Sequence, residues 1–322
     1  MKAAIVTKAG ATPVYGDFNE PRPSTGEVRI AVTAAALSPV VKSRASGAHY
    51  SATTAFPFVV GIDGVGRLDD GRRVYFILPK APLGSMAEQT VVASSHCVPL
   101  PDGLDDATAA AIANPGLSSW AAFKERARFK AGETVLVNGA TGTSGRLAVR
   151  IAKFLGARKV VATGRNAAAL KTLKPLGADA TIALDGNWEA TEAAFREHVS
   201  GGIDVVLDYL WGKSAEHLLA AIAKSSQEGV PIRFVQIGHS SGASINLAAP
   251  TLRSAAIELM GSGLGSVALP RIVKTVDELM QAAVKGGFDI ATRPVALAEV
   301  ERTWPADTGT PRIVFTIGKG GR

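Results

Sequence analysis

A glycine-rich segment in the middle of the chain is the clearest chemical motif of this sequence. Residues 139–145 read GATGTSG and lie between a strand-like apolar run and a segment of helical periodicity. A strand, a glycine turn and the amino end of a helix bring backbone N–H groups and the positive helix dipole to one point. A pyrophosphate fits there, since Gly142 allows its close approach and Gly145 allows the helix to pack on the strand. We predict a dinucleotide-binding loop rather than a merely structural turn, with the binding residues Ala140, Thr141, Gly142, Thr143 and Ser144.

The end of the next strand-like run, residues 159–163, indicates which dinucleotide binds. Enzymes that use NAD place a carboxylate there, where it binds the ribose 2′-hydroxyl. In this sequence Gly164 and Arg165 follow the run, with no acid. An arginine guanidinium can bind a 2′-phosphate through two hydrogen bonds, although Arg165 could also be an ordinary surface arginine. The pattern favours NADPH over NADH.

Two other motifs indicate different enzymes, and each lacks what its chemistry needs. Residues 238–242 read GHSSG, the G-x-S-x-G pattern of a hydrolase nucleophile, but no histidine follows Ser240 to complete a triad. Tyr209 and Lys213 have the Y-x-x-x-K spacing of short-chain dehydrogenases, but Gly212 disfavours the helix that would carry the pair. We interpret the first motif as a turn after a sheet strand and the second as a coincidence.

The cysteine and histidine pattern does not predict a metal site. Cys97 is the single cysteine, which excludes an internal disulfide and a thiolate cluster. Its neighbour His96 is adjacent in sequence, a poor arrangement for two ligands of one ion, and the other histidines are far apart. We therefore expect no bound metal.

The elements that position these motifs follow two patterns. The first part of the chain contains short apolar runs broken by glycine and proline, which is typical of a barrel-like β domain. These runs are residues 2–7, 27–35, 64–68, 73–77 and 88–92. The middle of the chain alternates apolar strands with helices, which predicts parallel βαβ units and a doubly wound sheet. Its strand-like runs are residues 134–138, 159–163, 203–208, 232–237 and 256–260.

Two connections complete the predicted architecture. Helical periodicity starts at Asp105, and we expect the sequence Asn-Pro-Gly at residues 114–116 to break it before a second helix. A last strand-like run, residues 312–317, follows a polar turn, and we expect it to rejoin the first β domain. The β domain would then be split in sequence, with the nucleotide domain inserted.

Composition and charge are those of an ordinary globular protein. The 322 residues are 47% hydrophobic and 20% charged, with no apolar run long enough to span a membrane and no signal-peptide pattern. The net charge of +7 is spread along the chain without a basic block or interleaved aromatic residues, which argues against nucleic-acid binding. We expect a cytoplasmic protein.

The order of β domain, central nucleotide loop and returning strand resembles the medium-chain dehydrogenase/reductase superfamily, and more closely its zinc-independent quinone oxidoreductase-like branch. The resemblance covers essentially the whole chain. It rests on the phosphate loop and on the segments at residues 36–39, 57–66, 84–88, 116–120 and 261–265. It implies an α/β fold, with a doubly wound Rossmann domain at residues 116–265 inserted into a GroES-like catalytic domain at residues 1–115 and 266–322.

The resemblance also implies a reaction and further site residues. Zinc-dependent members carry metal ligands where this chain has Ser38, Ile62 and Pro115, so direct hydride transfer from NADPH to a quinone or an α,β-unsaturated carbonyl compound is implied. Ser38 and Tyr50 would line the substrate cleft, with Tyr50 as hydrogen-bond donor to the acceptor oxygen or as a packing residue. The residues placed at the cofactor are Ser118, Gly238, His239 and Ser240.

The assembly and the activity leave alternatives open. The resemblance implies a homodimer formed through the sheet edge at residues 256–260. A metal-free alcohol dehydrogenase is a second enzymatic interpretation, although the sequence offers no obvious strong base. A non-enzymatic NADPH-binding sensor or scaffold is a third, because a fold does not by itself establish the chemistry.

Overall fold

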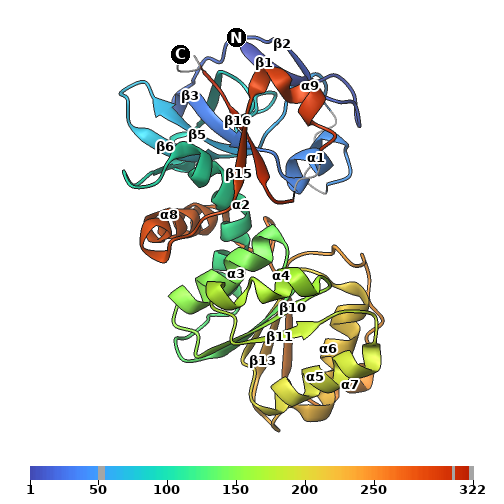
Figure 1. Ribbon diagram of the computed structural model, residues 1–322. Coiled ribbons are helices and arrows are strands. Elements are labelled where there is room, and N and C mark those ends of the chain that lie inside the picture. Colours follow the sequence, from blue (N-terminus) through green and yellow to red (C-terminus); the bar gives the residue numbers. More distant parts are fainter. Residues whose placement is uncertain (50–54, 307–308, 319–322) are drawn as a thin grey trace. The chain divides into compact units, whose positions relative to one another are not determined.

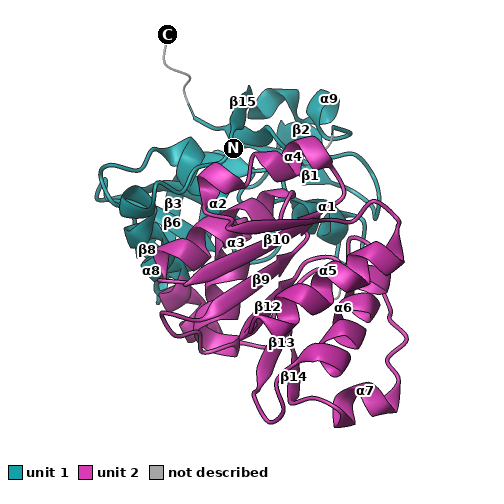
Figure 2. Cartoon of the chain, turned by 60° about the horizontal axis from the view of Figure 1, so that its bottom comes forward, with its two compact units in different colours: residues 1–114, 276–322 teal, residues 115–275 magenta. Residues whose placement is uncertain are grey.

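The computed structural model describes residues 1–49, 55–306 and 309–318 of the chain. The chain divides into two compact units (Figure 2). The first comprises Met1–Asn114 and Val276–Arg322, and the second comprises Pro115–Thr275. Among the described residues, no helix is both long enough and apolar enough to cross a bilayer.

The second unit is built on one parallel sheet. Its strands are β9 (Thr134–Asn138), β10 (Lys159–Gly164), β11 (Ala180–Ala183), β12 (Val205–Asp208), β13 (Ile232–Gln236) and β14 (Ile257–Gly261). Their spatial order is β11-β10-β9-β12-β13-β14, and every neighbouring pair is parallel. The chain therefore starts in the middle of the sheet and reverses its direction of winding between β9 and β12, the switch point at which such sheets bind dinucleotides.

Helices cover both faces of this sheet. They are α3 (Thr143–Phe154), α4 (Ala167–Lys171), α5 (Trp188–Ser200), α6 (Gly212–Ser225) and the short α7 (Ala249–Arg253). The buried stripe of α3 includes Leu147, Ala148, Ile151 and Ala152, spaced as a helix spaces one face. Figures 1 and 2 show α3 on one side of the sheet and the adjacent pair α5 and α6 on the other. This arrangement confirms the predicted doubly wound fold.

The first unit consists of β-sheet structure around its own core. A three-stranded sheet has the order β2-β1-β4, and a larger sheet has the order β15-β16-β3-β5-β6-β8, with β7 also paired to β3. These strands are β1 (Lys2–Val6), β2 (Val14–Asp17), β3 (Glu27–Ala36), β4 (Phe58–Val59), β5 (Asp63–Leu68), β6 (Arg73–Ile77), β7 (Gln89–Ala93), β8 (Cys97–Pro99), β15 (Thr292–Ala296) and β16 (Arg312–Thr316). Ile30, Phe76 and Phe315 are fully buried in the core between them. Two short helices, α1 (Pro39–Ala45) and α9 (Val300–Thr303), also belong to this unit.

The returning strand lies where the sequence predicts it. β16 pairs antiparallel with β3, and Val314 faces Ala36 while Phe315 faces Ala35. The strand that ends the described chain therefore closes the sheet begun near its start. The nucleotide-type sheet is inserted between the two parts of this β unit.

The predicted helix break at residues 114–116 is wrong. A single helix, α2 (Asp106–Ala121), runs through Pro115, and a turn of π-helix at Ala122–Arg126 follows it. Proline removes one N–H donor and crowds the preceding turn, which usually ends or kinks a helix. Here two serine hydroxyls, those of Ser118 and Ser119, donate to the Pro115 carbonyl within the same helix.

The chain crosses between its units inside helices. The first crossing is at Asn114 in α2, and the second is at Thr275 in α8 (Leu269–Gly286). The sequence places the second boundary earlier, after residue 265. Contacts hold the intervening residues to the second unit, because Arg271 pairs with Glu125 and the Ser266 carbonyl accepts from Arg126.

Candidate functional site

The loop after β9 lies at the carboxyl edge of the sheet, beside the switch point. Gly139 turns the chain with a φ of +90°. Its N–H donates to the Thr163 hydroxyl at 3.0 Å, and the Ala140 N–H donates to the Thr163 carbonyl at 2.8 Å. The first half of the loop is therefore tied to the end of β10. The residues at 143–145 then open α3, whose amino end faces the same edge.

The glycines of this loop and of the adjacent end of β10 differ in whether a side chain would fit at their positions. A Cβ on Gly145 would lie 2.3 Å from the Gly139 carbonyl oxygen, so only glycine lets α3 pack against the loop. A Cβ on Gly164 would lie 2.4 Å from a methyl group of Thr141. A Cβ on Gly142 would meet only the Gly139 oxygen, at 3.9 Å. Open space in front of Gly142, beside a helix amino terminus, is what a pyrophosphate needs.

A buried hydrogen-bond network at the strand ends holds the start of the loop after β9 in place. The Asn138 amide donates to an Asp208 carboxylate oxygen at 2.9 Å, and its own oxygen accepts from Thr163 at 2.7 Å and from Ser214 at 2.9 Å. Asp208 also accepts from the backbone N–H groups of Leu210 and Trp211. Burial raises the pKa of Asp208, against the effect of these hydrogen bonds. The network joins the ends of β9, β10 and β12 to the start of α6.

The turn at residues 238–242 packs over the end of β12. The Gly238 N–H donates to the Asp208 carbonyl at 3.1 Å, and a Cβ on Gly238 would lie 2.7 Å from the Tyr209 carbonyl oxygen. The Ser240 hydroxyl donates to that Tyr209 oxygen at 3.1 Å. Ser240 therefore holds a loop in place, in keeping with a turn after a sheet strand.

The residues Ser118 and Tyr209 lie at the same edge. The Ser118 hydroxyl donates to the Pro115 carbonyl at 2.7 Å, and the Ser119 hydroxyl is 2.7 Å from that of Tyr209. Burial raises the pKa of Tyr209 to about 12, although hydrogen bonds with Ser119 and Ser118 act in the opposite direction. Tyr209 thus links the end of β12 to α2 by a side-chain hydrogen bond.

Arg165 follows the end of β10 directly. Gly164 is buried, whereas Arg165 is exposed. The next residue, Asn166, caps α4 by accepting from the Ala169 N–H at 2.9 Å. No acid lies at the end of this strand, so a 2′-phosphate there would meet a guanidinium rather than a carboxylate.

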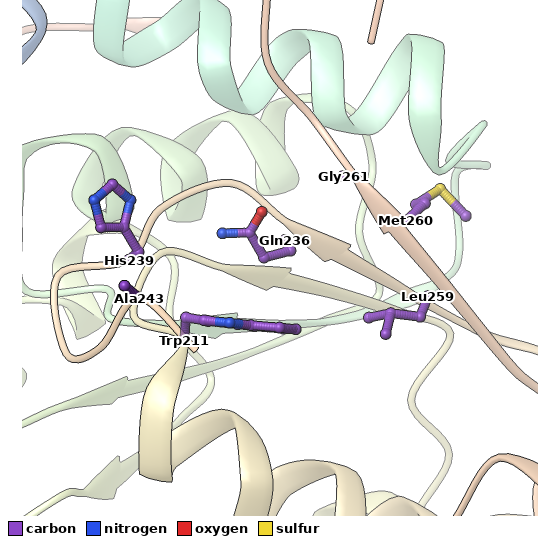
Figure 3. A pocket seen from close by; sticks show the side chains of 7 residues that line it. All are labelled: Trp211, Gln236, His239, Ala243, Leu259, Met260 and Gly261. Carbon is purple, nitrogen blue, oxygen red and sulfur yellow. The ribbon is translucent and has the colours of Figure 1, made fainter. Parts of the chain in front are cut away.

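A pocket of about 440 Å³ opens beside the loop after β13 (Figure 3). Its lining residues are Trp211, Gln236, His239, Ala243, Leu259, Met260 and Gly261. Figure 3 shows the Trp211 indole edge-on below the Gln236 amide, with His239 on the loop side. The Gln236 amide donates to the Gly238 carbonyl at 2.9 Å, so the pocket wall and the turn are held together.

The residues predicted to act on the substrate belong to the first unit. Ser38 is 1% exposed and caps α1, its hydroxyl accepting from the Val41 N–H at 3.3 Å. Tyr50 lies outside the described residues. In the described part of the chain, no group of three or more His, Cys, Asp or Glu side chains is placed to hold a metal ion.

Three site residues are not predicted by the sequence motifs. Asn138, Asp208 and Tyr209 form the connections between the loops, yet they are isolated polar residues at the ends of two apolar strands, β9 and β12. The signal that could identify them is their position, because polar residues at the carboxyl ends of adjacent parallel strands meet at one edge. The loop residues 139–145, Gly164, Arg165, Ser118 and the turn at 238–240 all lie at that edge of the second unit.

This edge fits a dinucleotide. The space at Gly142, the close packing that requires glycine at Gly145 and the α3 amino terminus suit a pyrophosphate. Arg165 suits a 2′-phosphate by its charge and its planar donor set. Strand order and loop chemistry together define a Rossmann-type nucleotide-binding unit.

Comparison with known proteins places the chain in a family. A family model described as zinc-binding dehydrogenase matches residues 145–285. A probable NADPH-dependent quinone reductase of Emericella nidulans is 31% identical, over 98% of this chain and 99% of that protein. A quinone oxidoreductase of Rattus norvegicus is 30% identical, over 69% of this chain and 70% of that protein. The chain belongs to the medium-chain dehydrogenase/reductase family, among its quinone oxidoreductase-like members.

Solved structures agree with this assignment. The quinone oxidoreductase of Thermus thermophilus, whose structure was also determined in complex with NADPH, matches with a TM-score of 0.80 and 26% identity. The match covers 98% of this chain and 100% of that one.

Proposed function

We propose that this chain is a reductase that transfers hydride from NADPH to a quinone or to the double bond of an α,β-unsaturated carbonyl compound, without zinc. The observation that carries the proposal is the phosphate loop at the switch point, followed at the next strand end by Gly164 and Arg165 in place of an acid. The name of the Emericella nidulans relative, a probable NADPH-dependent quinone reductase, supports it.

The nucleotide end of the site rests on the second unit. Bound NADPH supplies the hydride. The backbone at Ala140, Thr141, Gly142, Thr143 and Ser144 holds the pyrophosphate, and Gly164 and Arg165 hold the 2′-phosphate. Ser118 and the turn Gly238, His239 and Ser240 orient the nicotinamide end. Orientation of donor and acceptor is the main catalytic contribution that these residues make.

The substrate end of the site belongs to the first unit in this proposal. Residues 1–115 and 266–322 form the catalytic domain, with Ser38 and Tyr50 at the acceptor, and residues 116–265 form the NADPH-binding domain. Ser38, Ile62 and Pro115 stand at the positions of zinc ligands in metal-dependent relatives, and a serine hydroxyl, an alkyl chain and a proline are poor ligands for a catalytic zinc. The acceptor gains hydride at one atom and a proton, supplied by water or by a weak side-chain donor, at its oxygen or at the adjacent carbon.

We also propose that the protein is cytoplasmic and forms a homodimer. β14 pairs only with β13 among the described strands, so its outer edge offers a place where a second copy could pair. Its small-molecule partner is the quinone or enone acceptor.

The first experiment follows oxidation of NADPH and NADH with a small quinone and a simple enone as acceptors. We expect turnover with NADPH and little with NADH. Arg165→Ala should lower kcat/KM for NADPH about ten- to hundredfold, the loss of one or two charge-assisted hydrogen bonds, and leave that for NADH nearly unchanged. Arg196→Ala is the matched control, since Arg196 is an exposed arginine of α5.

The outcomes separate the parts of the proposal. A preference for NADH, or an Arg165→Ala variant that matches the wild type with NADPH, would contradict the cofactor assignment and leave the reductase in place. Tight NADPH binding without turnover of any electrophile would favour a sensor or scaffold.

A further inference from the structure

Neither the sequence motifs nor the proposed reaction assigns a role to Tyr209. Its apparent pairing with Lys213 does not occur on one helix, because α6 begins at Gly212, after Tyr209. Lys213 is exposed in the first turn of α6, whereas Tyr209 is half-buried at the edge of the sheet. The tyrosine therefore has to be explained by what it contacts at the switch point.

The backbone of Tyr209 is fixed from two directions. Its N–H donates to the Asn138 carbonyl at 3.0 Å, which ties it to the end of β9. Its carbonyl accepts from the Ser240 hydroxyl at 3.1 Å and from the Ser240 N–H at 3.4 Å, which ties it to the turn after β13. The base of the phenol side chain thus has little freedom to move.

The hydroxyl of Tyr209 belongs to a cluster of three hydroxyl groups. It lies 2.7 Å from the Ser119 hydroxyl, and the Ser118 hydroxyl donates to the Pro115 carbonyl at 2.7 Å. The Ser119 hydroxyl is also 3.4 Å from that carbonyl. Two of the three hydroxyls donate to one carbonyl, and each hydroxyl can also accept through two lone pairs, so lone pairs of the cluster remain available to a ligand at this edge.

We propose that Tyr209 is a positioning residue, which through Ser119 and Ser118 orients the nicotinamide end of bound NADPH for hydride transfer. The inference rests on the proposed function, because the proposed function places Ser118 at the nicotinamide end of the cofactor. Tyr209 connects three elements that would surround the ring: the end of β9 and the turn after β13 through its backbone, and α2 through its hydroxyl. With a pKa raised to about 12 by burial, the phenol keeps its proton at neutral pH and acts as a neutral hydrogen-bonding group.

The test compares ligands with and without the nicotinamide. Tyr209→Phe and Ser119→Ala are titrated with NADPH and with 2′-phospho-ADP-ribose, which lacks the nicotinamide. We expect each variant to weaken NADPH binding about five- to tenfold, the value of one hydrogen bond, and to bind the fragment like the wild type. The double variant should lose no more than either single variant, because both remove the same interaction. Tyr15→Phe in β2 is the matched control and should leave both affinities unchanged.

Kinetics supply a second measurement. With a quinone acceptor, Tyr209→Phe should lower kcat while the KM for the quinone stays within about twofold, since the acceptor itself is not contacted. Equal weakening of NADPH and of the fragment would show that Tyr209 only maintains the loops, and unchanged affinity for both would show that it does not orient the cofactor. Either result overturns the inference. A wild type without turnover would instead contradict the proposed function, and the two titrations would still decide the role of Tyr209.

Discussion

Asp63 shows at the scale of one residue how the first unit holds buried charge. It lies in β5, 5% exposed, and accepts from the Tyr75 hydroxyl at 2.8 Å. The nearby Arg312 is also buried, at 3% exposure. Burial raises the pKa of Asp63 to about 6, against the Tyr75 hydrogen bond and the Arg312 charge, which lower it. The folded protein therefore binds a proton at Asp63 more readily than the unfolded chain does.

This raised pKa predicts how stability depends on pH. Between about pH 4 and 6 the folded state carries more protons than the unfolded state, so the contribution of Asp63 to the free energy of unfolding falls as pH rises through about 6. From about pH 5.0 to 7.5 the loss is about 1 kcal/mol. Urea unfolding at these two pH values should show that Asp63→Asn removes this loss, whatever its absolute stability. If the variant keeps the wild-type change, another group titrates in this range.

At the scale of an element, the turn between β12 and α6 carries backbone strain. Trp211 has φ 56° and ψ −156°, close to a region that is essentially restricted to glycine. Its N–H lies 3.2 Å from both Asp208 carboxylate oxygens, and a Cβ on the following Gly212 would lie 2.7 Å from the Ser241 carbonyl oxygen. These contacts hold the turn, and they keep the indole in the wall of the pocket in Figure 3.

Two substitutions of Trp211 separate strain from packing. Trp211→Ala and Trp211→Gly both remove the indole and its edge contact with Phe234, whose ring centroid is 6.4 Å away. Only alanine keeps a Cβ at the strained position. The glycine variant should therefore be more stable than the alanine variant by about 1–2 kcal/mol, measured as the difference in the free energy of unfolding. Equal stabilities would mean that the turn relaxes once the indole is gone.

The longer elements could be predicted from the sequence, because their patterns are local. The expected bounds of β3, β6, β9 and β10 agree with the structure to within a residue. Of the described strands, the sequence does not predict β2, β4, β8, β11 and β15, and the first four of these have at most four residues. Two of these strands contain a proline, Pro99 in β8 and Pro294 in β15, and a proline usually argues against predicting a strand. Both strands lie at the ends of their sheet path, where a missing N–H is tolerated.

The candidate site also has a part that the sequence predicts and a part that it does not. The phosphate loop and Arg165 are visible because glycine spacing and a strand end are features of a short segment. The link from Asn138 to Asp208 spans 70 residues, and that from Ser119 to Tyr209 spans 90. Such contacts depend on which strands are adjacent, which the order of the sheet decides. The helix through Pro115 was missed because proline usually ends a helix, whereas here the helix continues on both sides of it.

At the scale of the whole molecule, the proposed homodimer can be tested at the outer edge of the parallel sheet. β14 lies at the end of the sheet, and Leu259 in it is 38% exposed. If two copies pair there, Leu259→Lys should shift the protein from dimer to monomer, because a charge would be buried at the symmetric contact. Analytical ultracentrifugation measures this, with Val14→Lys, on the exposed side of β2, as the control. A variant that stays dimeric would place the interface elsewhere.

The helical crossings between the two units determine how the protein can be divided. Most multidomain chains can be cut at an exposed, flexible connection. Here a cut at Asn114 would sever α2 in its interior, and a cut at Thr275 would sever α8 while Ile272 and Val276 are buried. A fragment limited to residues 115–275 would therefore carry two truncated helices, each with newly orphaned backbone groups and apolar side chains. We therefore expect an expressed fragment of residues 115–275 to be less stable than the same residues within the whole chain, because both of its terminal helices are cut.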